Sequence, residues 1–368
     1  MKPARILILT QEFPPDVGGC GVVAKSMANY LWKQGVGVNV LTSGNGDILD
    51  YSNGYRVEIA PRVPKIFPLI FMRRLLRYKL KEFTAILVND VGAMMIAVFL
   101  PKRFQKKCLV YLQGGELNIF YKLPGKFKVL NFFGFKQKYI QLLKRSNQIL
   151  AVSECMKQEF LSVSGLQELK DKITIVMPAI NEELFYPETS DLRQKYQIPA
   201  TSEVILSAGR IDLHKGYQEQ YDVFKKLIEK DSNFHWLIVG TGPFEEDFKK
   251  MVQQDGLGIF ITFAGRVEQS ELRKYYSVAD VFWQLSIWEA LGLVYLEANA
   301  CGRPAIGLKN SNVQEIINAE NGFLVEKPEE SLAIFLERKY KKFETSQLID
   351  HVKKHNQKQG RLLELLNK

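Results

Sequence analysis

Short apolar runs alternate with amphipathic stretches along this 368-residue chain, and this alternation limits the folds open to it. Residues 4–10 form an apolar run, and a loop rich in Pro and Gly follows at residues 13–21. An amphipathic stretch at residues 22–34 leads to a second apolar run at residues 36–42. Strand, loop, helix and strand in this order predict a βαβ unit, which builds a parallel sheet with helices on its faces.

The same alternation occurs twice. Further strand candidates form two groups, at residues 85–88, 108–113, 148–152 and 173–177, and then at residues 203–209, 235–240, 259–264, 281–284, 304–307 and 322–325. We therefore predict α/β domains at residues 1–180 and 201–345. Residues 181–200 contain Pro187 and Pro199 and read as a linker. A polar helical segment at residues 346–368 ends the chain, and packing back onto the first domain is one option for it.

Composition indicates a globular protein, with 46% hydrophobic and 24% charged residues. The four cysteines lie far apart and form no CxxC pair, which favours a reducing compartment and argues against structural zinc. The first residues show no signal-peptide pattern, and the longest uncharged apolar run, at residues 91–100, is too short to span a bilayer. We expect a cytoplasmic protein.

Positive charge is concentrated in the first half of the chain. Residues 1–180 hold 26 Lys and Arg against 12 Asp and Glu, whereas the remainder holds 24 against 28. This asymmetry suggests an anionic partner for the first half, although generic basicity would also explain it. No nucleic-acid-binding motif occurs, so nucleic acid is not the expected partner.

Two basic stretches suggest peripheral contact with an anionic membrane. Residues 69–82 are predicted to form a basic amphipathic helix that carries Arg73, Arg74 and Arg77, and residues 121–138 mix Lys with Phe. An ordinary helix with a solvated charged face is the alternative. If the membrane hypothesis is right, the protein would act at the inner face of the plasma membrane.

The most informative single stretch is WEALGLVYLEANACGRP at residues 288–304, which holds two acids around a Gly-containing turn. Residues 293–300 are apolar apart from Glu297 and Asn299, so a buried helix is predicted to begin near Gly292. Backbone N–H groups at a helix N-terminus bind anions, so a phosphate fits at Leu293 and Val294. Glu289 precedes this helix and Glu297 lies inside it, so they would contact different parts of one ligand. The alternative is a buried helix whose acids are a cap and an ion-pair partner.

Glycines and cations follow several predicted strands, where open α/β sheets bind ligands. Arg210 and Lys215 would place two positive charges beside a helix N-terminus, an arrangement suited to a diphosphate. The glycines would let the backbone approach a ligand closely, although tight turns alone would explain them. The positions at strand ends are Gly18, Gly19, Gly21, Gly209, Gly240, Gly242, Gly265 and Arg266.

Six motifs spread over most of the chain together resemble a family 4 retaining glycosyltransferase. They are FPPxxGGxG (Phe13, Pro14, Pro15, Gly18, Gly19, Gly21), PGVDxxxFxP with Asn181 for Asp (Pro178, Ile180, Asn181, Phe185, Pro187), GRxxxxKG (Gly209, Arg210, Lys215, Gly216), VGxGP (Val239, Gly240, Gly242, Pro243), AD (Ala279, Asp280) and ExxGxxxxEAxAxGxP (Glu289 to Pro304). The resemblance implies the GT-B architecture, in which two facing Rossmann-like domains enclose an active-site cleft.

The resemblance also implies a role for each matching residue. Arg210 and Lys215 would hold the diphosphate of a nucleotide sugar, together with the backbone at Leu293 and Val294. Glu297 would accept hydrogen bonds from the ribose. The remaining roles are the donor-sugar hydroxyls for Glu289, closure of the N-terminal loop for Gly19, and proximity to the base for Arg266 or Val267.

Two departures from the family pattern stand out. Gln113, in the segment QGGE, replaces a His that many relatives carry, and residues 1–180 contain no His. Gln113 could still bind a donor-sugar hydroxyl, and Glu116 could supply a base. Ala290 replaces the Gly that usually follows the first Glu. These departures leave an inactive or partner-dependent relative as an alternative.

We expect a retaining glycosyltransferase that moves a sugar from a UDP- or GDP-linked donor to a glycan or lipid-linked acceptor, in surface polysaccharide or glycolipid biosynthesis. The chain contains no Asp-x-Asp motif, which would be expected of the metal-dependent GT-A architecture, so no metal is expected. The resemblance implies no other cofactor. A GT-B nucleotide-sugar epimerase is the alternative within this fold. A nicotinamide dehydrogenase is excluded, because the GxGxxG fingerprint is absent. The oligomeric state is not defined by the sequence.

Overall fold

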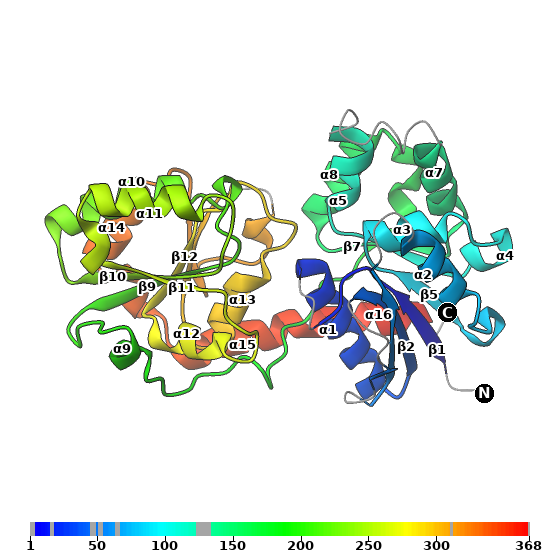
Figure 1. Cartoon of the computed structure of the whole chain (residues 1–368), viewed down its shortest axis with the longest axis horizontal. Helices are drawn as coiled ribbons and strands as arrows, with labels where there is room; N and C mark the ends of the chain where they lie inside the picture. Colours follow the sequence, from blue (N-terminus) through cyan, green and yellow to red (C-terminus); the bar gives the residue numbers. More distant parts are fainter. Residues whose placement is uncertain are drawn as a thin grey trace. The chain divides into compact units, whose positions relative to one another are not determined.

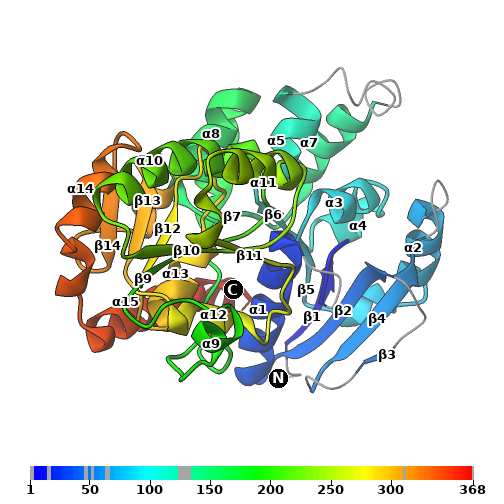
Figure 2. The same ribbon diagram turned by 60° about the vertical axis from the view of Figure 1, so that its left-hand side comes forward.

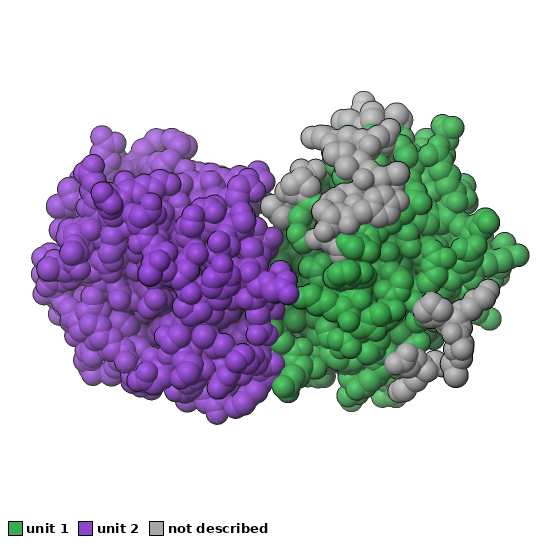
Figure 3. All heavy atoms as spheres, turned by 90° about the horizontal axis from the view of Figure 1, so that it is seen from below, with its two compact units in different colours: residues 1–179, 356–368 green, residues 180–355 purple. Residues whose placement is uncertain are grey.

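The computed structural model describes residues 4–14, 18–44, 49–50, 54–62, 67–122, 134–309 and 312–366. The chain divides into two compact units, which Figure 3 colours separately. Unit 1 comprises Met1–Ala179 together with Asn356–Lys368, and unit 2 comprises Ile180–His355. The end of the chain is therefore part of the same compact unit as its beginning.

Unit 1 is built on an eight-stranded sheet in the order β3-β4-β2-β1-β5-β6-β7-β8. All neighbouring strands are parallel except β3 and β4. The strands are β1 (Arg5–Leu9), β2 (Gly37–Gly44), β3 (Leu49–Asp50), β4 (Arg56–Pro61), β5 (Ala85–Val88), β6 (Cys108–Leu112), β7 (Gln148–Ala151) and β8 (Ile173–Ile175). Figure 2 shows helix α1 on one face of this sheet and helices α3 and α4 on the other.

The helices of unit 1 are α1 (Gly19–Lys33), α2 (Phe67–Leu75), α3 (Val91–Ala97), α4 (Lys102–Gln105), α5 (Gly115–Leu117), α7 (Phe135–Arg145), α8 (Glu154–Ser164) and α16 (Arg361–Leu366). Shorter helical turns are η1 (Leu80–Glu82), η2 (Asn118–Lys122), η3 (Gln167–Lys172) and η8 (Lys358–Gly360).

Unit 2 is built on a six-stranded parallel sheet in the order β11-β10-β9-β12-β13-β14. Its strands are β9 (Glu203–Ala208), β10 (Phe234–Val239), β11 (Ile261–Gly265), β12 (Val281–Gln284), β13 (Ala305–Leu308) and β14 (Gly322–Val325). In Figure 1, helices α10, α11 and α14 cover one face of this sheet and α12 and α13 cover the other.

The helices of unit 2 are α9 (Leu192–Lys195), α10 (Tyr217–Lys230), α11 (Glu245–Gln254), α12 (Leu272–Val278), α13 (Leu293–Ala300), α14 (Glu330–Leu336) and α15 (Thr345–Gln357), whose last residues belong to unit 1. Shorter turns are η4 (Leu213–Lys215), η5 (Leu257–Ile259), η6 (Val313–Glu315) and η7 (Lys339–Lys342).

The central strands are apolar without alternation because helices cover both faces of each sheet. All residues of β5 and β10 are buried, and Trp236 and Trp283 are fully buried in the core of unit 2. The predicted fold class, two Rossmann-like α/β domains with mostly parallel sheets, is confirmed.

Strand order reverses once in each sheet, between β1 and β5 in unit 1 and between β9 and β12 in unit 2. The connections leaving the two strands on either side of such a point run to opposite faces, which leaves a crevice beyond their carboxyl ends. Each unit therefore presents one position where a ligand is expected, formed by the segments that follow these strands.

The prediction of one helix over residues 69–82 was wrong. Helix α2 ends at Leu75, a turn follows, and η1 begins at Leu80. Leu75 and Leu80 are both buried. Residues five apart lie roughly 140° apart around a continuous helix, so a straight helix could not bury both in one core. Most of the basic stretch at residues 121–138 lies outside the described residues.

Two further differences concern missed elements. Strand β4 was not predicted from the sequence, and its burial pattern is interrupted by the partly exposed Arg56, Ile59 and Pro61. Residues 181–200, predicted as a linker, lie in unit 2 and contain α9, and the predicted C-terminal helix is divided into α15, η8 and α16.

The loop after β10 depends on a glycine. Gly240 has φ of 132°, and a Cβ built there would lie 1.8 Å from the carbonyl oxygen of Gly209. Gly240→Ala should lower the free energy of unfolding by about 2–4 kcal/mol through backbone strain and this clash. Gly258→Ala is the control, because a Cβ there has no neighbour within 4 Å. Urea unfolding measures the stability of both variants. An equal effect of the two changes would contradict the conclusion that the loop after β10 requires glycine at position 240.

Candidate functional site

The crevice of unit 2 contains an ion pair between Lys215 and Glu289. Lys215 ends η4 after β9, and Glu289 follows β12, so adjacent strands place them together. Lys215 Nζ lies 2.5 Å from Glu289 Oε1, and the side chains are 28% and 12% exposed. Ser286 Oγ also donates a hydrogen bond to Glu289 Oε1, at 2.8 Å. The carboxylate is thus held in one position by a cation and a hydroxyl, while remaining accessible.

The two loops that carry this pair are joined by further contacts. The backbone N–H of Ile287 donates to the carbonyl of His214 at 2.9 Å, and the Gln284 amide donates to the carbonyl of Lys215. Gly216 adopts φ of 77°, and a Cβ there would lie 2.1 Å from the carbonyl oxygen of Leu285. A glycine is therefore required for the loops to approach this closely.

Helix α13 begins directly after the Glu289 loop. Gly292 precedes it in the left-handed conformation, with φ of 89°, and no side chain caps the helix. The first turn, at Leu293 and Val294, carries no acidic residue. The backbone N–H groups and the positive end of the helix dipole thus lie beside the Lys215–Glu289 pair, a combination that attracts anions.

Glu297 lies within α13 and is buried. The hydroxyl of Tyr276, on α12, donates to Glu297 Oε2 at 2.8 Å. Burial raises the pKa of Glu297 to about 7, and the Tyr276 hydrogen bond opposes this shift. Near neutral pH this carboxyl therefore exchanges between a charged acceptor and a neutral group.

Three other predicted residues of unit 2, Arg210, Arg266 and Val267, follow strands β9 and β11. Arg210 has a 70% exposed side chain, and its Nε lies 3.9 Å from Asp212 Oδ2. Among the described residues it forms no ion pair with either glutamate. Arg266 is exposed and Val267 is partly exposed after β11.

The glycines at the strand ends of unit 2 link neighbouring loops. The N–H of Gly240 donates to the carbonyl of Gly265 at 2.8 Å, and that of Gly209 donates to Val239 at 2.9 Å. A Cβ at Gly242 would lie 2.1 Å from the carbonyl oxygen of Ile211. These loops are therefore packed backbone against backbone, and Gly242 leaves no room for a side chain.

Asp90 organises the crevice of unit 1. It follows β5 and caps α3 by accepting from the N–H of Ala93 at 2.8 Å. Its other oxygen accepts from the hydroxyl of Thr10 at 2.7 Å and from the N–H of Gln11 at 2.5 Å. A carboxylate that accepts several such bonds fixes the segment after β1 relative to α3.

Gln113 and Glu116, which were predicted to bind a donor-sugar hydroxyl and to supply a base, make contacts within unit 1. The Gln113 amide donates to the carbonyl and the Oδ1 of Asn89, at 2.5 and 3.0 Å. Glu116 is buried and accepts from the N–H of Gly114 at 3.1 Å. Burial raises its pKa to about 7, against the effect of backbone N–H groups that point at the carboxyl. Both side chains thus stabilise the turn after β6.

Gly18 and Gly19 lie at the start of helix α1, which begins at Gly19. Gly18 precedes the helix, and a Cβ there would lie 2.1 Å from Glu12 Oε2. Gly19 is exposed, and a Cβ there has no neighbour within 4 Å. Space for a close approach to the backbone thus exists at Gly19, whereas Glu12 covers Gly18. Pro15 lies outside the described residues.

Several residues of these crevices were missed in the sequence. Asn89 and Asp90 come directly after the strand at residues 85–88, and a polar pair at that position is a signal that could have revealed them. Ser286 lies three residues before Glu289, but nothing in the pattern shows its side chain turning toward that acid. Tyr276 reaches Glu297 from 21 residues away.

The described ranges contain no group of three or more His, Cys, Asp and Glu side chains that could hold a metal ion. Within the same ranges, no helix is both long enough and apolar enough to cross a membrane.

The two halves of the chain match two family descriptions. Residues 17–184 match Glycosyltransferase Family 4, and residues 188–357 match Glycosyl transferases group 1. Together these matches span nearly the whole chain.

Individual relatives resemble the chain over most of its length. An uncharacterized glycosyltransferase of Methanocaldococcus jannaschii is 26% identical over 87% of this chain and 85% of its own. N-acetyl-alpha-D-glucosaminyl L-malate synthase of Bacillus anthracis is 25% identical over 85% and 81%. Alpha-monoglucosyldiacylglycerol synthase of Streptococcus pneumoniae is 22% identical over 85% and 73%.

Solved structures share the fold. Sucrose-phosphate synthase of Thermosynechococcus elongatus aligns with a TM-score of 0.78 at 20% identity, over 99% of both chains. HepE of Anabaena, solved in complex with UDP and glucose, aligns with a TM-score of 0.77 at 18% identity, also over 99% of both chains.

Glu297 should make stability depend on pH. Its pKa is about 7 in the folded chain and near the ordinary 4.5 when unfolded, so the folded state binds more protons between these values. Its contribution to the free energy of unfolding is therefore greatest below pH 4.5 and decreases as pH rises to 7. Glu297→Gln does not titrate, so from pH 4.5 to 7.5 its stability relative to wild type should increase by about 1–3 kcal/mol.

Urea unfolding across this pH range measures the effect. Glu229→Gln is the control, because Glu229 is exposed on α10. If the stability difference between Glu297→Gln and wild type did not change with pH, Glu297 would not titrate near 7.

Proposed function

Because this chain belongs to glycosyltransferase family 4, we propose that it moves a sugar from a nucleotide-diphosphate sugar to a glycan or lipid-linked acceptor, in glycolipid or surface polysaccharide biosynthesis. The observation that carries this proposal is the Lys215–Glu289 pair beside the N-terminus of α13. It combines a cation and a helix dipole for a diphosphate with a fixed carboxylate for sugar hydroxyls.

The diphosphate would bind at Lys215, Arg210 and the backbone of Leu293 and Val294. Lys215 has three N–H donors, so it can keep its contact with Glu289 while donating to a phosphate oxygen. Arg210 has an exposed side chain that can turn toward the ligand. The donor would be UDP- or GDP-linked, and UDP in the Anabaena structure supports a uridine nucleotide.

The two glutamates would recognise opposite ends of the donor. Glu289, oriented by Lys215 and Ser286, would accept hydrogen bonds from the transferred sugar. Glu297 would accept hydrogen bonds from the ribose in its ionised form. Gly19, Gly209 and Gly242 would allow backbone approach, and Arg266 and Val267 would lie near the base.

Transfer would proceed with retention of configuration. The bond between the anomeric carbon and the diphosphate breaks, which builds positive charge on the sugar ring and negative charge on the leaving oxygen. Lys215, Arg210 and the α13 terminus would stabilise the leaving group without a metal or other cofactor. The acceptor hydroxyl attacks from the same face, its oxygen bonds to the anomeric carbon, and its proton passes to the departing phosphate.

Unit 1 would present the acceptor. Gln113 and Glu116 would act there by positioning the turn after β6, because both make contacts within that unit. A lipid-linked acceptor would place the protein in the cytoplasm at the inner face of the membrane. The glycolipid named in the Streptococcus relative supports such an acceptor.

Lys215→Ala should weaken binding of UDP, or of GDP if that is the nucleotide, by at least about tenfold, because a charge-assisted bond to the diphosphate is lost. Glu297→Ala should also weaken it through the lost ribose contacts. Isothermal titration calorimetry measures both. Lys225→Ala is the control, since Lys225 lies on α10 and pairs with Asp255. Unchanged affinity in both test variants would overturn the donor site.

A product assay then separates the alternatives. Incubation with labelled nucleotide sugar and acceptor should yield an α-configured product from an α-linked donor. A changed sugar without acceptor would indicate an epimerase, and binding without any product would indicate an inactive relative.

Membrane contact can be tested on α2 and the turn after it. Leu69 and Leu76 are 72% and 68% exposed, and Arg73 and Arg77 are exposed beside them. The wild type should float with vesicles containing anionic lipid, and Arg73→Glu with Arg77→Glu should lower the floated fraction severalfold. Arg74 is left unchanged because it pairs with Glu58. Lys102→Glu with Lys106→Glu is the control and should leave the floated fraction unchanged. Absence of flotation of the wild type would contradict the membrane hypothesis.

A further inference from the structure

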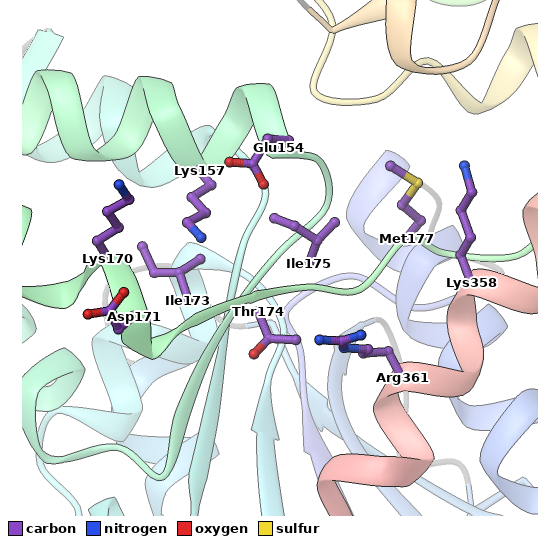
Figure 4. Close-up of a pocket in the computed structure, with 10 residues that line it drawn as sticks. All are labelled: Glu154, Lys157, Lys170, Asp171, Ile173, Thr174, Ile175, Met177, Lys358 and Arg361. Atoms are coloured by element: carbon purple, nitrogen blue, oxygen red, sulfur yellow. The ribbon is translucent and has the colours of Figure 1, made fainter.

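Unit 1 contains a concave surface whose residues have no role in the donor site proposed above. It is a pocket of about 650 Å³ along strand β8 (Figure 4). Its walls come from α8, η3, β8 and the segment formed by η8 and α16, all of which belong to unit 1. Residues from the C-terminal segment thus complete a pocket whose other walls lie about 200 residues earlier in the sequence.

Four cations line this pocket: Lys157, Lys170, Lys358 and Arg361. None of them forms an ion pair with any other residue that the structure describes. Figure 4 shows Lys157 reaching toward β8 from α8, and Arg361 reaching toward it from α16. Positive groups that line one pocket without an ion-pair partner among the described residues leave a site for an anionic ligand.

Two acids, Glu154 and Asp171, also line the pocket. They would repel a ligand that consists only of negative charge, but a carboxylate accepts hydrogen bonds from hydroxyl groups. Cations and acids in one pocket therefore suit a ligand that carries both an anionic group and hydroxyls. None of the described lining residues is aromatic, so a neutral sugar would find no ring to stack on.

The size of the pocket and its apolar lining residues agree with this chemistry. A volume of about 650 Å³ lies in the range of small-molecule sites and exceeds the needs of a single phosphate. The lining includes Ile173 and Met177, which are 4% and 9% exposed. A phosphorylated monosaccharide or a short acidic oligosaccharide would fill such a space.

Strand β8 adds backbone groups to the pocket. It is the last strand on its side of the described sheet and pairs only with β7 there. The N–H of Val176 donates to Ala151 on β7, so the backbone of the preceding Ile175 faces the open side. An acidic peptide could pair with this edge, but Glu154 and Asp171 disfavour it.

We propose that this pocket binds an anionic carbohydrate, that is, a sugar bearing a phosphate or carboxylate group, at a site in unit 1 that is distinct from the Lys215–Glu289 donor site in unit 2. Lys157 and Arg361 contact the anionic group, and Glu154 and Asp171 accept hydrogen bonds from hydroxyls. The ligand has two potential sources. It is either a free sugar phosphate or an acidic residue of a growing glycan.

Calorimetry at low salt on the full chain tests the proposal with glucose 6-phosphate, galacturonate and tetragalacturonate as probes. At least one probe should bind wild type, and Lys157→Ala with Arg361→Ala should weaken it at least tenfold. Glucose should not bind. Lys102→Ala with Arg103→Ala removes the same charge elsewhere in unit 1 and should change affinity less than twofold.

Further controls make the result specific. Lys157→Gln with Arg361→Gln should reproduce the loss while keeping the wild-type melting temperature, which separates ligand contacts from folding. Lys215→Ala should leave probe binding intact, whereas it should weaken nucleotide binding. The experiments can therefore refute the proposed carbohydrate pocket without refuting the proposed donor site, and the reverse.

The probes also distinguish the two sources. Tight binding of glucose 6-phosphate indicates a free sugar phosphate, and tetragalacturonate binding at least tenfold tighter than galacturonate indicates a polymer. Three results would overturn the proposal: no binding of any probe, binding that survives both pocket variants, or binding of hexaglutamate as tight as that of the best carbohydrate, which would identify a peptide-binding edge.

Discussion

The reversal of strand order in each sheet is the constraint on which the candidate sites depend. In unit 2, β9 and β12 lie side by side and their connections run to opposite faces, so the segments after them meet above the sheet. This arrangement brings Lys215 to within 2.5 Å of Glu289 Oε1. Gly216 then allows the two loops to approach more closely than any side chain would permit. Sheet topology and glycine backbone together create the ion pair.

Buried polar groups set the electrostatic character of both crevices. Asp90 accepts four hydrogen bonds and so has partners for its charge, whereas burial raises the pKa of Glu116 and Glu297 to about 7. A buried carboxyl costs free energy unless it is neutral or well bonded. Glu116 is turned toward backbone N–H groups, which fits a structural role. Glu297 meets only a tyrosine hydroxyl among the contacts described, so it keeps capacity to accept hydrogen bonds from a ligand.

The positive charge of the first half of the chain is divided among different structural settings. Arg56 and Arg74 pair with Glu58, so part of the charge is neutralised within unit 1. Arg73 and Arg77 remain exposed near Leu69 and Leu76. A further group, which includes Lys157, converges on β8 with cations from the end of the chain. Net charge alone could not separate these settings, because they differ in burial and pairing.

Local sequence pattern was enough to predict most strands, both Rossmann-like domains and the start of α13. The spacing of apolar residues and the positions of glycines, on which these predictions rest, are properties of residues close together in the sequence. It failed at residues 69–82, where the burial of both Leu75 and Leu80 overrode a continuous helical pattern. The sequence by itself determined the fold class and the residue types available for chemistry. Only the tertiary structure decided which of them meet: Lys215 with Glu289, 74 residues apart, and Tyr276 with Glu297. The same holds for Arg361 beside β8, because contacts between distant segments depend on strand order and packing, which no local pattern records.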